Sequence, residues 1–196
     1  MEVRCGAPAP SVAELKAMGY TQILYAVGAW KPGQLGIPGD VAGAIQWMKG
    51  VKAGNIAVGG NVAVVGAGNT AMDAARLAKR SGAEHVTIVY RRTRKYMPAD
   101  EHELALALAD GVTFAELCAP VEQKDGVLRC EKMKLGEADA SGRRSPVATG
   151  EYVDIPCDLV ISAVGEQVDS DLLASNGVEV DGKGRPAFRT NVEGVY

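Results

Sequence analysis

The residues best suited to chemistry form a glycine-containing turn, Gly66-Ala67-Gly68-Asn69-Thr70. An apolar run, residues 62–65, precedes the turn, and a helical pattern of small residues begins at about Asn69. This order predicts a strand, a tight turn and a helix N-terminus, which together offer backbone N–H groups and the positive end of a helix dipole to a phosphate. Gly66 allows the turn, and Gly68 lets the backbone approach a pyrophosphate closely. The turn therefore predicts a site for the pyrophosphate of a dinucleotide.

A cluster of arginines, Arg91, Arg92 and Arg94, follows the next expected strand, residues 83–90. In NAD-binding units an Asp or Glu about 20 residues beyond the glycines binds the ribose 2′-OH. Arginines stand at that place here, and a guanidinium fork matches a phosphate that a carboxylate would repel. The cluster therefore favours NADPH over NADH, and the simpler alternative is a solvated basic loop.

Other reactive side chains have simpler explanations. Asp100, Glu101 and Glu103 fall in the first turns of a helix expected to begin near Pro98, where acids are favourable against the dipole. His102 lies among them, but we nominate no residue as catalytic. The four cysteines are widely spaced without a C-x-x-C pair, so they predict neither a metal centre nor an iron–sulfur cluster.

The composition is that of an ordinary globular protein. The chain has 196 residues, 47% hydrophobic and 23% charged, with a net charge of −3. This charge gives no reason to expect nucleic acid or an anionic membrane as a partner. No apolar run reaches the roughly 20 residues that span a bilayer, and no signal peptide is recognisable, so a cytoplasmic location is expected.

The elements that must position these groups follow from the apolar patterns. We expect an α/β fold in which a Rossmann-like parallel sheet carries an antiparallel β-meander. The expected helices and strands are residues 11–18 (helix), 21–30 (strand), 41–51 (helix), 62–65 (strand), 69 onward (helix), 83–90 (strand), 112–118 (strand), 151–155 (strand) and 158–166 (strand). Asp125-Gly126 is a hairpin signal, and residues 136–150 are expected to form a loop. The tail, residues 178–188, is expected to form another hairpin.

Two strands closing on Ala-Val-Gly, at residues 26–28 and 163–165, bracket the nucleotide-binding motif. This echo indicates a domain inserted between two passes through a neighbouring domain. The expected divisions are residues 1–54, 55–166 and 167–196, with the middle division forming the NADPH-binding domain.

Several motifs together resemble one family. They are Ala-Val-Gly-Ala-Trp (26–30), Ile-Pro-Gly (37–39), Gly-x-Gly-Asn-Thr-Ala-Met-Asp-Ala-Ala-Arg (66–76), Val-Tyr-Arg-Arg-Thr (89–93), Met-Pro-Ala (97–99) and Ala-Val-Gly (163–165). In this order they resemble the FAD-dependent, NADPH-linked oxidoreductases typified by the glutamate synthase small subunit. Dihydropyrimidine dehydrogenase and the selenate reductase flavoprotein subunit share the pattern.

The resemblance implies an NADPH domain inserted into an FAD domain, whose partial segments flank it here. Gly66, Gly68, Asn69 and Thr70 would hold the pyrophosphate, and Arg91 and Arg92, with Arg94, would hold the 2′-phosphate. Gly165 and Glu166 would lie near the nicotinamide. The parent would pass hydride from NADPH to FAD and onward to further electron-transfer subunits or domains.

The chain departs from the family at both flanks. No G-x-G-x-x-G turn for FAD precedes residue 20, and the flavin-contacting Ala-x-Gly-Asp segment is missing. We therefore expect a piece of a larger flavoprotein that binds NADPH and does not transfer hydride alone. Two rivals remain: a non-catalytic nucleotide-binding or interaction module, and a methyltransferase, which would want an acid where Arg91 and Arg92 stand.

Overall fold

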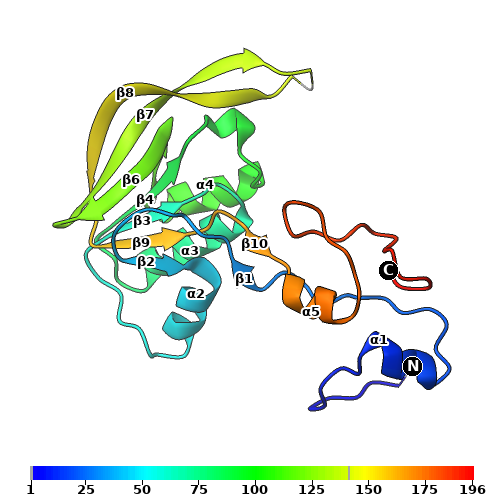
Figure 1. Cartoon of the computed structure of the whole chain (residues 1–196). Helices are drawn as coiled ribbons and strands as arrows, with labels where there is room; N and C mark the ends of the chain where they lie inside the picture. Colours follow the sequence, from blue (N-terminus) through cyan, green and yellow to red (C-terminus); the bar gives the residue numbers. More distant parts are fainter. Residues whose placement is uncertain (1, 141) are drawn as a thin grey trace. The chain divides into compact units, whose positions relative to one another are not determined.

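A computed structural model describes residues 2–140 and 142–196 and divides the chain into two compact units (Figure 1). The central unit is Pro32–Gly165. The split unit combines the residues up to Lys31 with Glu166–Tyr196. The central unit begins earlier than the nucleotide-binding domain predicted from residue 55, because a strand and a helix from residues 41–52 pack with its sheet.

A parallel sheet forms the middle of the central unit. Its five strands lie in the order β2-β9-β3-β4-β5. Their bounds are Val41–Gly43 (β2), Leu159–Ser162 (β9), Asn61–Val65 (β3), His85–Tyr90 (β4) and Thr113–Glu116 (β5). Every pairing within this sheet is parallel, as the Rossmann-like prediction requires. The carboxyl ends of β3, β4 and β9 therefore meet at one edge, where ligands bind in such folds.

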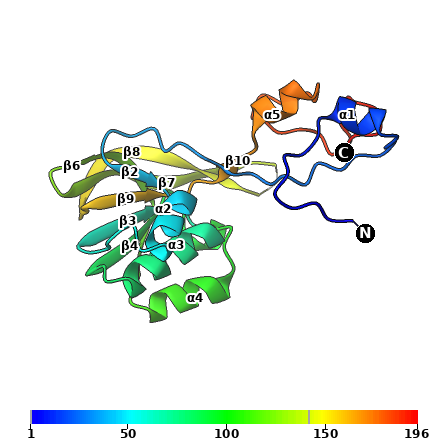
Figure 2. The ribbon, with the colours of Figure 1, turned by 90° about the horizontal axis from the view of Figure 1, so that it is seen from below.

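Three helices cover one face of this sheet, as Figure 2 shows. They are α2 (Ala44–Lys52), α3 (Asn69–Arg80) and α4 (Glu101–Ala109). Helix α3 turns a row of alanines and Met72 toward Val64 and Ile88 of the sheet, all of them fully buried. Small side chains allow the helix to approach the strands closely. The predicted helix begins at Asn69 as expected, but Pro98 precedes the first turn of α4, whose N-cap is Asp100.

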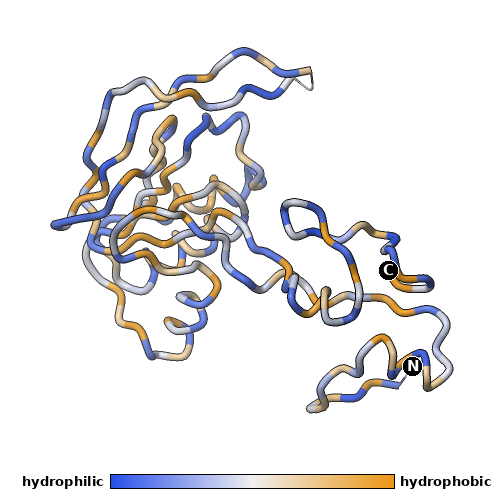
Figure 3. Tube along the Cα trace, viewed as in Figure 1, coloured by the Kyte–Doolittle hydropathy of each residue, from blue (hydrophilic) through white to orange (hydrophobic). Residues whose placement is uncertain are grey.

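The antiparallel meander covers the other face of the sheet. It consists of β6 (Cys118–Lys124), β7 (Val127–Ala138) and β8 (Arg144–Pro156) in sequential order. Leu128 and Cys130 of β7 are buried against Ala63, Val65 and Val89 of the parallel sheet. Figure 3 shows the apolar residues gathered in these inner strands. The central unit thus has one helical layer and one antiparallel layer on the two faces of a parallel sheet.

The Asp125-Gly126 hairpin is confirmed, since both residues have positive φ, 52° and 76°, between β6 and β7. The loop predicted over residues 136–150 is wrong for residues 136–138 and 144–150, which are strand, and residue 141 lies outside the described residues. Strand β7 continues to Ala138 and β8 starts at Arg144, because the two paired strands extend as a long hairpin beyond the sheet. Pairing of backbone groups sustains these strands even though their side chains there are mostly exposed.

The split unit contains α1 (Val12–Ala17) and α5 (Ser170–Ser175). Strands β1 (Lys31–Pro32) and β10 (Glu166–Gln167) form a two-stranded sheet. The capping box of α1 is confirmed, with Ser11 and Glu14 bonding each other's backbone N–H. The strand predicted over residues 21–30 is wrong. Within the described part of the chain, this run forms a single bridge, between Ile23 and Val195, and the Tyr25 N–H donates to the carbonyl of Tyr196 at 2.7 Å. The tail hairpin is reduced to a bridge between Val180 and Pro186.

Among the described residues, no helix is long and apolar enough to cross a membrane.

Candidate functional site

The glycine turn lies between the carboxyl ends of three strands. Gly66 has φ of 133°, a conformation open chiefly to glycine, and its N–H donates to the carbonyl of Val89 at 3.1 Å. A Cβ on Gly66 would collide with the carbonyl oxygen of Ala163, which follows β9. No side chain fits at this position. The chain must be glycine here to cross from β3 to α3.

The N-terminus of α3 is open toward an anion. Its N-cap is Gly68, which provides no side-chain cap, and the first turn holds no acidic residue. A Cβ on Gly68 would meet only Pro98 Cγ, at 3.8 Å, so the space above this residue is free of described backbone. Ala71, at the third position of the glycine motif, is fully buried against the sheet. The turn has the form of a pyrophosphate cradle, with unshielded helix N–H groups and a positive dipole end.

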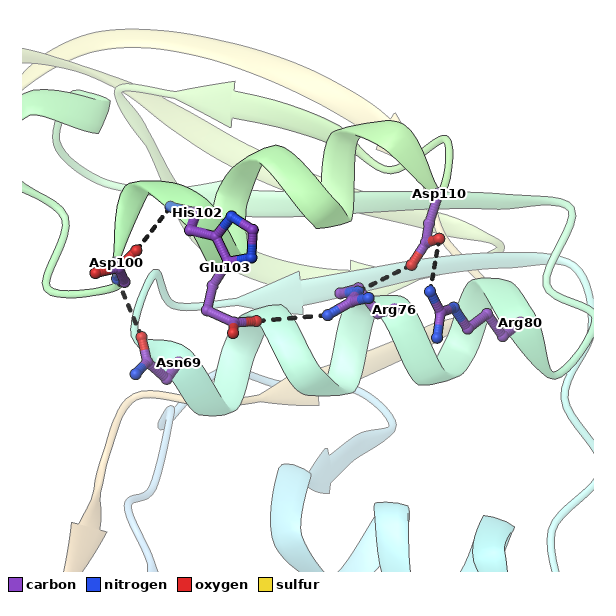
Figure 4. A network of polar contacts seen from close by, with 7 residues as sticks. All are labelled: Asn69, Arg76, Arg80, Asp100, His102, Glu103 and Asp110. Carbon is purple, nitrogen blue, oxygen red and sulfur yellow. Dashed lines mark hydrogen bonds and ion pairs between the residues drawn. The ribbon is translucent and has the colours of Figure 1, made fainter.

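The Asn69 side chain is tied to the next helix. Its Oδ1 accepts a hydrogen bond of 3.2 Å from the N–H of Asp100, and Asp100 in turn caps α4 through the N–H of His102 at 2.7 Å (Figure 4). The Ala99 N–H donates to the carbonyl of Ala67 at 3.0 Å. The segment leading into α4 is therefore anchored directly to the phosphate turn. Thr70 is half-buried one residue further on.

Two ion-paired helices support this anchor. Arg76 of α3 contacts Glu103 of α4 and Asp110, the C-cap of α4, and Asp110 also pairs with Arg80 (Figure 4). Hydrogen bonds from Arg80 and Arg76 hold the pKa of the Asp110 carboxyl below its usual value. Glu103 and Asp110 thus have arginine partners in the protein, and Asp100 and Glu103 lie at the start of α4, where the sequence predicts an acidic helix start.

The arginine loop, residues 91–94, follows β4 at the same sheet edge as the glycine turn. Arg91 is exposed, and no ion partner for it exists among the described residues. Arg92 is only 8% exposed, and its Nε is buried without a hydrogen-bond partner. A buried guanidinium nitrogen without an acceptor is costly, because it has lost its water and gained nothing in return. Arg92 is the residue here whose chemistry most calls for an anion.

Arg94 is held more tightly by the protein. Glu116, at the end of β5, accepts a hydrogen bond from the Arg94 N–H at 2.7 Å and lies 3.5 Å from its Nε. The guanidinium also lies 5.2 Å from the centroid of the Phe114 ring. The Arg94 guanidinium therefore already contacts Glu116 at its Nε edge and the Phe114 ring at its face, unlike the guanidinium groups of Arg91 and Arg92.

Gly165 and Glu166 fall on opposite sides of the unit boundary. Gly165 has φ of 113° and follows Ala163, whose carbonyl abuts Gly66, so it belongs to the neighbourhood of the glycine turn. Glu166 starts β10 in the split unit, and its place near a nicotinamide stays a prediction.

Glu116, Phe114 and Asp100 are neighbours of the site that the sequence motifs did not predict. The available signal was the sheet itself: β5 follows β4 in parallel, with Glu116 in register with Tyr90, so a polar residue ending β5 had to face the arginine loop. The described residues contain no cluster of ligands able to hold a metal.

Comparison with known proteins assigns the family. Residues 7–196 match the model of the pyridine nucleotide-disulphide oxidoreductases, and the chain belongs to this family. The family consists of flavoprotein oxidoreductases that bind FAD and NADPH.

Curated relatives are longer than this chain. It is 41% identical over 192 residues to the oxidoreductase YgfK of Escherichia coli K12, covering 95% of this chain and 19% of that protein. It is 35% identical over 229 residues to the NADPH-Fe(3+) oxidoreductase subunit beta of Geobacter sulfurreducens, covering 95% and 34%. Identity to the Escherichia coli glutamate synthase [NADPH] small chain is 38% over 136 residues, covering 65% and 29%. The chain thus spans about a fifth to a third of these relatives.

Solved structures share the fold. FprA from Mycobacterium tuberculosis in complex with NADPH superposes with a TM-score of 0.60 at 22% identity, covering 79% of this chain and 52% of that one. Thioredoxin reductase from T. acidophilum gives a TM-score of 0.58 at 18% identity, covering 86% of this chain and 53% of that one. At these identities the likeness concerns the fold alone.

Proposed function

We propose that the central unit is the NADPH-binding domain of a flavin-dependent oxidoreductase of the glutamate synthase small-subunit type. The observation that carries the proposal is Arg92, buried with an unpartnered Nε, in the loop that follows β4. A 2′-phosphate would supply the missing acceptor with a charge-assisted hydrogen bond. The relatives whose names specify NADPH point the same way.

Each part of the nucleotide has residues suited to it. The N–H groups at Gly68, Asn69 and Thr70 would hold the pyrophosphate, since no side-chain cap or acid competes for the start of α3. Arg91 and Arg92, with Arg94, would hold the 2′-phosphate, and Gly165 would allow close approach near the nicotinamide. The bound nucleotide and flavin would supply hydride transfer from NADPH to FAD.

The protein's part in this chemistry is positioning. Gly66 and Ala163 fix the turn, and Asp100 fixes Asn69, so the cradle is formed before a ligand arrives. No side chain at the site is proposed as a nucleophile or base. Because the chain covers a fraction of its relatives' length, hydride transfer and the onward electron acceptors are proposed for the larger protein, with the isolated chain inactive.

Calorimetric titration with NADPH and NADH tests the proposal. The wild-type chain is expected to prefer NADPH, and Arg91→Ala/Arg92→Ala to lose that preference. Each lost charge-assisted hydrogen bond should cost on the order of 1.5–3 kcal/mol. Equal affinity of the wild type for both nucleotides would refute the assignment of the arginines. Binding of neither would favour the non-catalytic module.

A further inference from the structure

Glu116 is the acidic residue that lies against the arginine loop. It ends β5, in register with Tyr90, the last residue of β4. Its Oε1 receives the Arg94 N–H at 2.7 Å and lies 3.5 Å from the Arg94 Nε. One carboxylate oxygen thus ties both the backbone and the side chain of the same arginine.

These contacts restrict the orientation of the Arg94 guanidinium. Glu116 occupies the Nε edge, and Phe114 lies against the guanidinium with its ring centroid 5.2 Å away. The fork of terminal nitrogens remains, on a side chain that is 47% exposed. A guanidinium restricted in this way loses less conformational entropy on binding an anion than a free arginine does.

The Glu116 carboxylate lies close to the proposed phosphate site. On its own it would repel a phosphate, and an acid after the second strand is how such folds select NADH. Here the acid stands one strand further along the sheet, and Arg94 lies against it as a counter-ion. Its charge therefore serves to orient a cation rather than to receive a ribose hydroxyl.

We propose that Glu116 is a positioning residue that sets the preference for NADPH over NADH by holding Arg94 and the arginine loop in a phosphate-binding arrangement. This inference rests on the proposed function of the site. It makes Arg94, through Glu116, part of the phosphate clamp, together with the unpartnered Arg92.

The test compares Kd for NADPH and for NADH in Glu116→Ala, Glu116→Gln, Arg94→Ala and the Glu116→Ala/Arg94→Ala double variant. Glu122→Ala, which removes an exposed acid from β6, is the matched control. NADH serves as an internal reference, because a general loss of structure weakens both nucleotides together. Thermal unfolding of each variant is recorded alongside.

We expect Glu116→Ala to lower the NADPH preference about tenfold, the effect of one charge-assisted hydrogen bond. Glu116→Gln keeps an oxygen acceptor for the Arg94 N–H and should restore most of the preference. The double variant should lose no more than Arg94→Ala, because both changes remove the same clamp.

Three results would overturn the inference: an unchanged preference in Glu116→Ala, tighter NADPH binding in both Glu116 variants, or additive losses in the double variant. If Arg92→Ala abolishes the preference while Glu116→Ala does not, the inference fails and the proposed function stands. If the wild type shows no preference for NADPH, both fail.

Discussion

The central unit buries apolar side chains in two large clusters, whereas the split unit buries them in a small one. The central unit has a core on each face of its parallel sheet, one under the helices and one under the meander. The split unit has a single small cluster of buried residues, which includes Val12, Leu173 and Val195. Large apolar side chains stay exposed there, and Phe188 is 82% exposed.

This difference indicates where the stability of the chain resides. A sheet covered on both faces satisfies its backbone groups and its apolar side chains internally. The split unit leaves an apolar cavity of about 180 Å³ open beside Tyr25, Phe188 and Tyr196. Because exposed apolar patches mark surfaces made for contact, we expect the split unit to be the weaker of the two.

Thiol reactivity should separate the units most sharply. Cys5 is exposed in the split unit, whereas Cys118, Cys130 and Cys157 are buried in the central unit. Burial raises the pKa of the Cys130 thiol to about 12, which further disfavours the reactive thiolate. We expect one fast-reacting thiol, and three that react about a thousandfold more slowly because they require an opening of about 4 kcal/mol or more.

A disulfide reagent that releases a coloured thiol measures the reaction rate of each class of cysteine, with Cys5→Ser as the control. Removal of Cys5 should abolish the fast phase and leave the slow one. Rapid reaction of a second thiol in the native chain would show that the meander opens easily, contrary to this comparison.

Truncation of buried side chains should give the next largest difference between the units, in the free energy of unfolding. Ile88→Ala removes a fully buried side chain from the core under the helices and should lower the free energy of unfolding of the central unit by about 2–5 kcal/mol. Leu173→Ala is the matched change in the split unit. It should leave the central transition unchanged, because Leu173 does not belong to either core of that unit.

Urea denaturation followed by tryptophan fluorescence can assign these effects. The chain has two tryptophans, Trp47 in the central unit and Trp30 in the split unit. A Trp30→Phe background therefore reports on Trp47 alone. Equal destabilisation of the Trp47 signal by both truncations would mean that the units unfold as one.

The smallest change in stability is expected from loss of the ion pairs between α3 and the α4 region. The arginines around Asp110 lower its pKa from the ordinary value of 3.8, so the stabilisation is present above that pH and is lost as pH falls through the lowered pKa. Asp110→Asn should destabilise the central unit slightly at pH 7, and the difference from wild type should vanish in acid. Thermal unfolding from pH 7 down to the lowest pH at which the wild type stays folded measures this, with Glu137→Gln, exposed on β7, as the control. A difference independent of pH would contradict the assigned cause.

The sequence predicts the central unit better than the split unit, for a physical reason. Around Gly66 the local signals and the tertiary packing agree: apolar strand, glycine turn and alanine-rich helix each suit their place. The apolar run over residues 21–30 carries an equally clear strand signal, but among the described residues only Ile23 of this run forms a bridge. A strand needs neighbours, and a local pattern cannot supply them.

The candidate site shows the same limit. The glycines and arginines are recognisable because their spacing along the chain is short. Arg92 is buried without a partner at Nε, whereas Arg94 is paired with Glu116. This difference depends on the order of the strands in the sheet. That order follows from the sheet, and pairing of β5 with β4 brings Glu116 to the arginine loop.

The most direct test of the account is the ratio of the NADH and NADPH dissociation constants in Arg92→Ala, measured by calorimetry. Arg144→Ala, an exposed arginine on β8, is the matched control for the loss of one positive charge. If Arg92 binds the 2′-phosphate, the NADH-to-NADPH ratio falls at least about tenfold in Arg92→Ala and stays at the wild-type value in Arg144→Ala. An undiminished ratio in Arg92→Ala would contradict the claim that this buried guanidinium binds the 2′-phosphate.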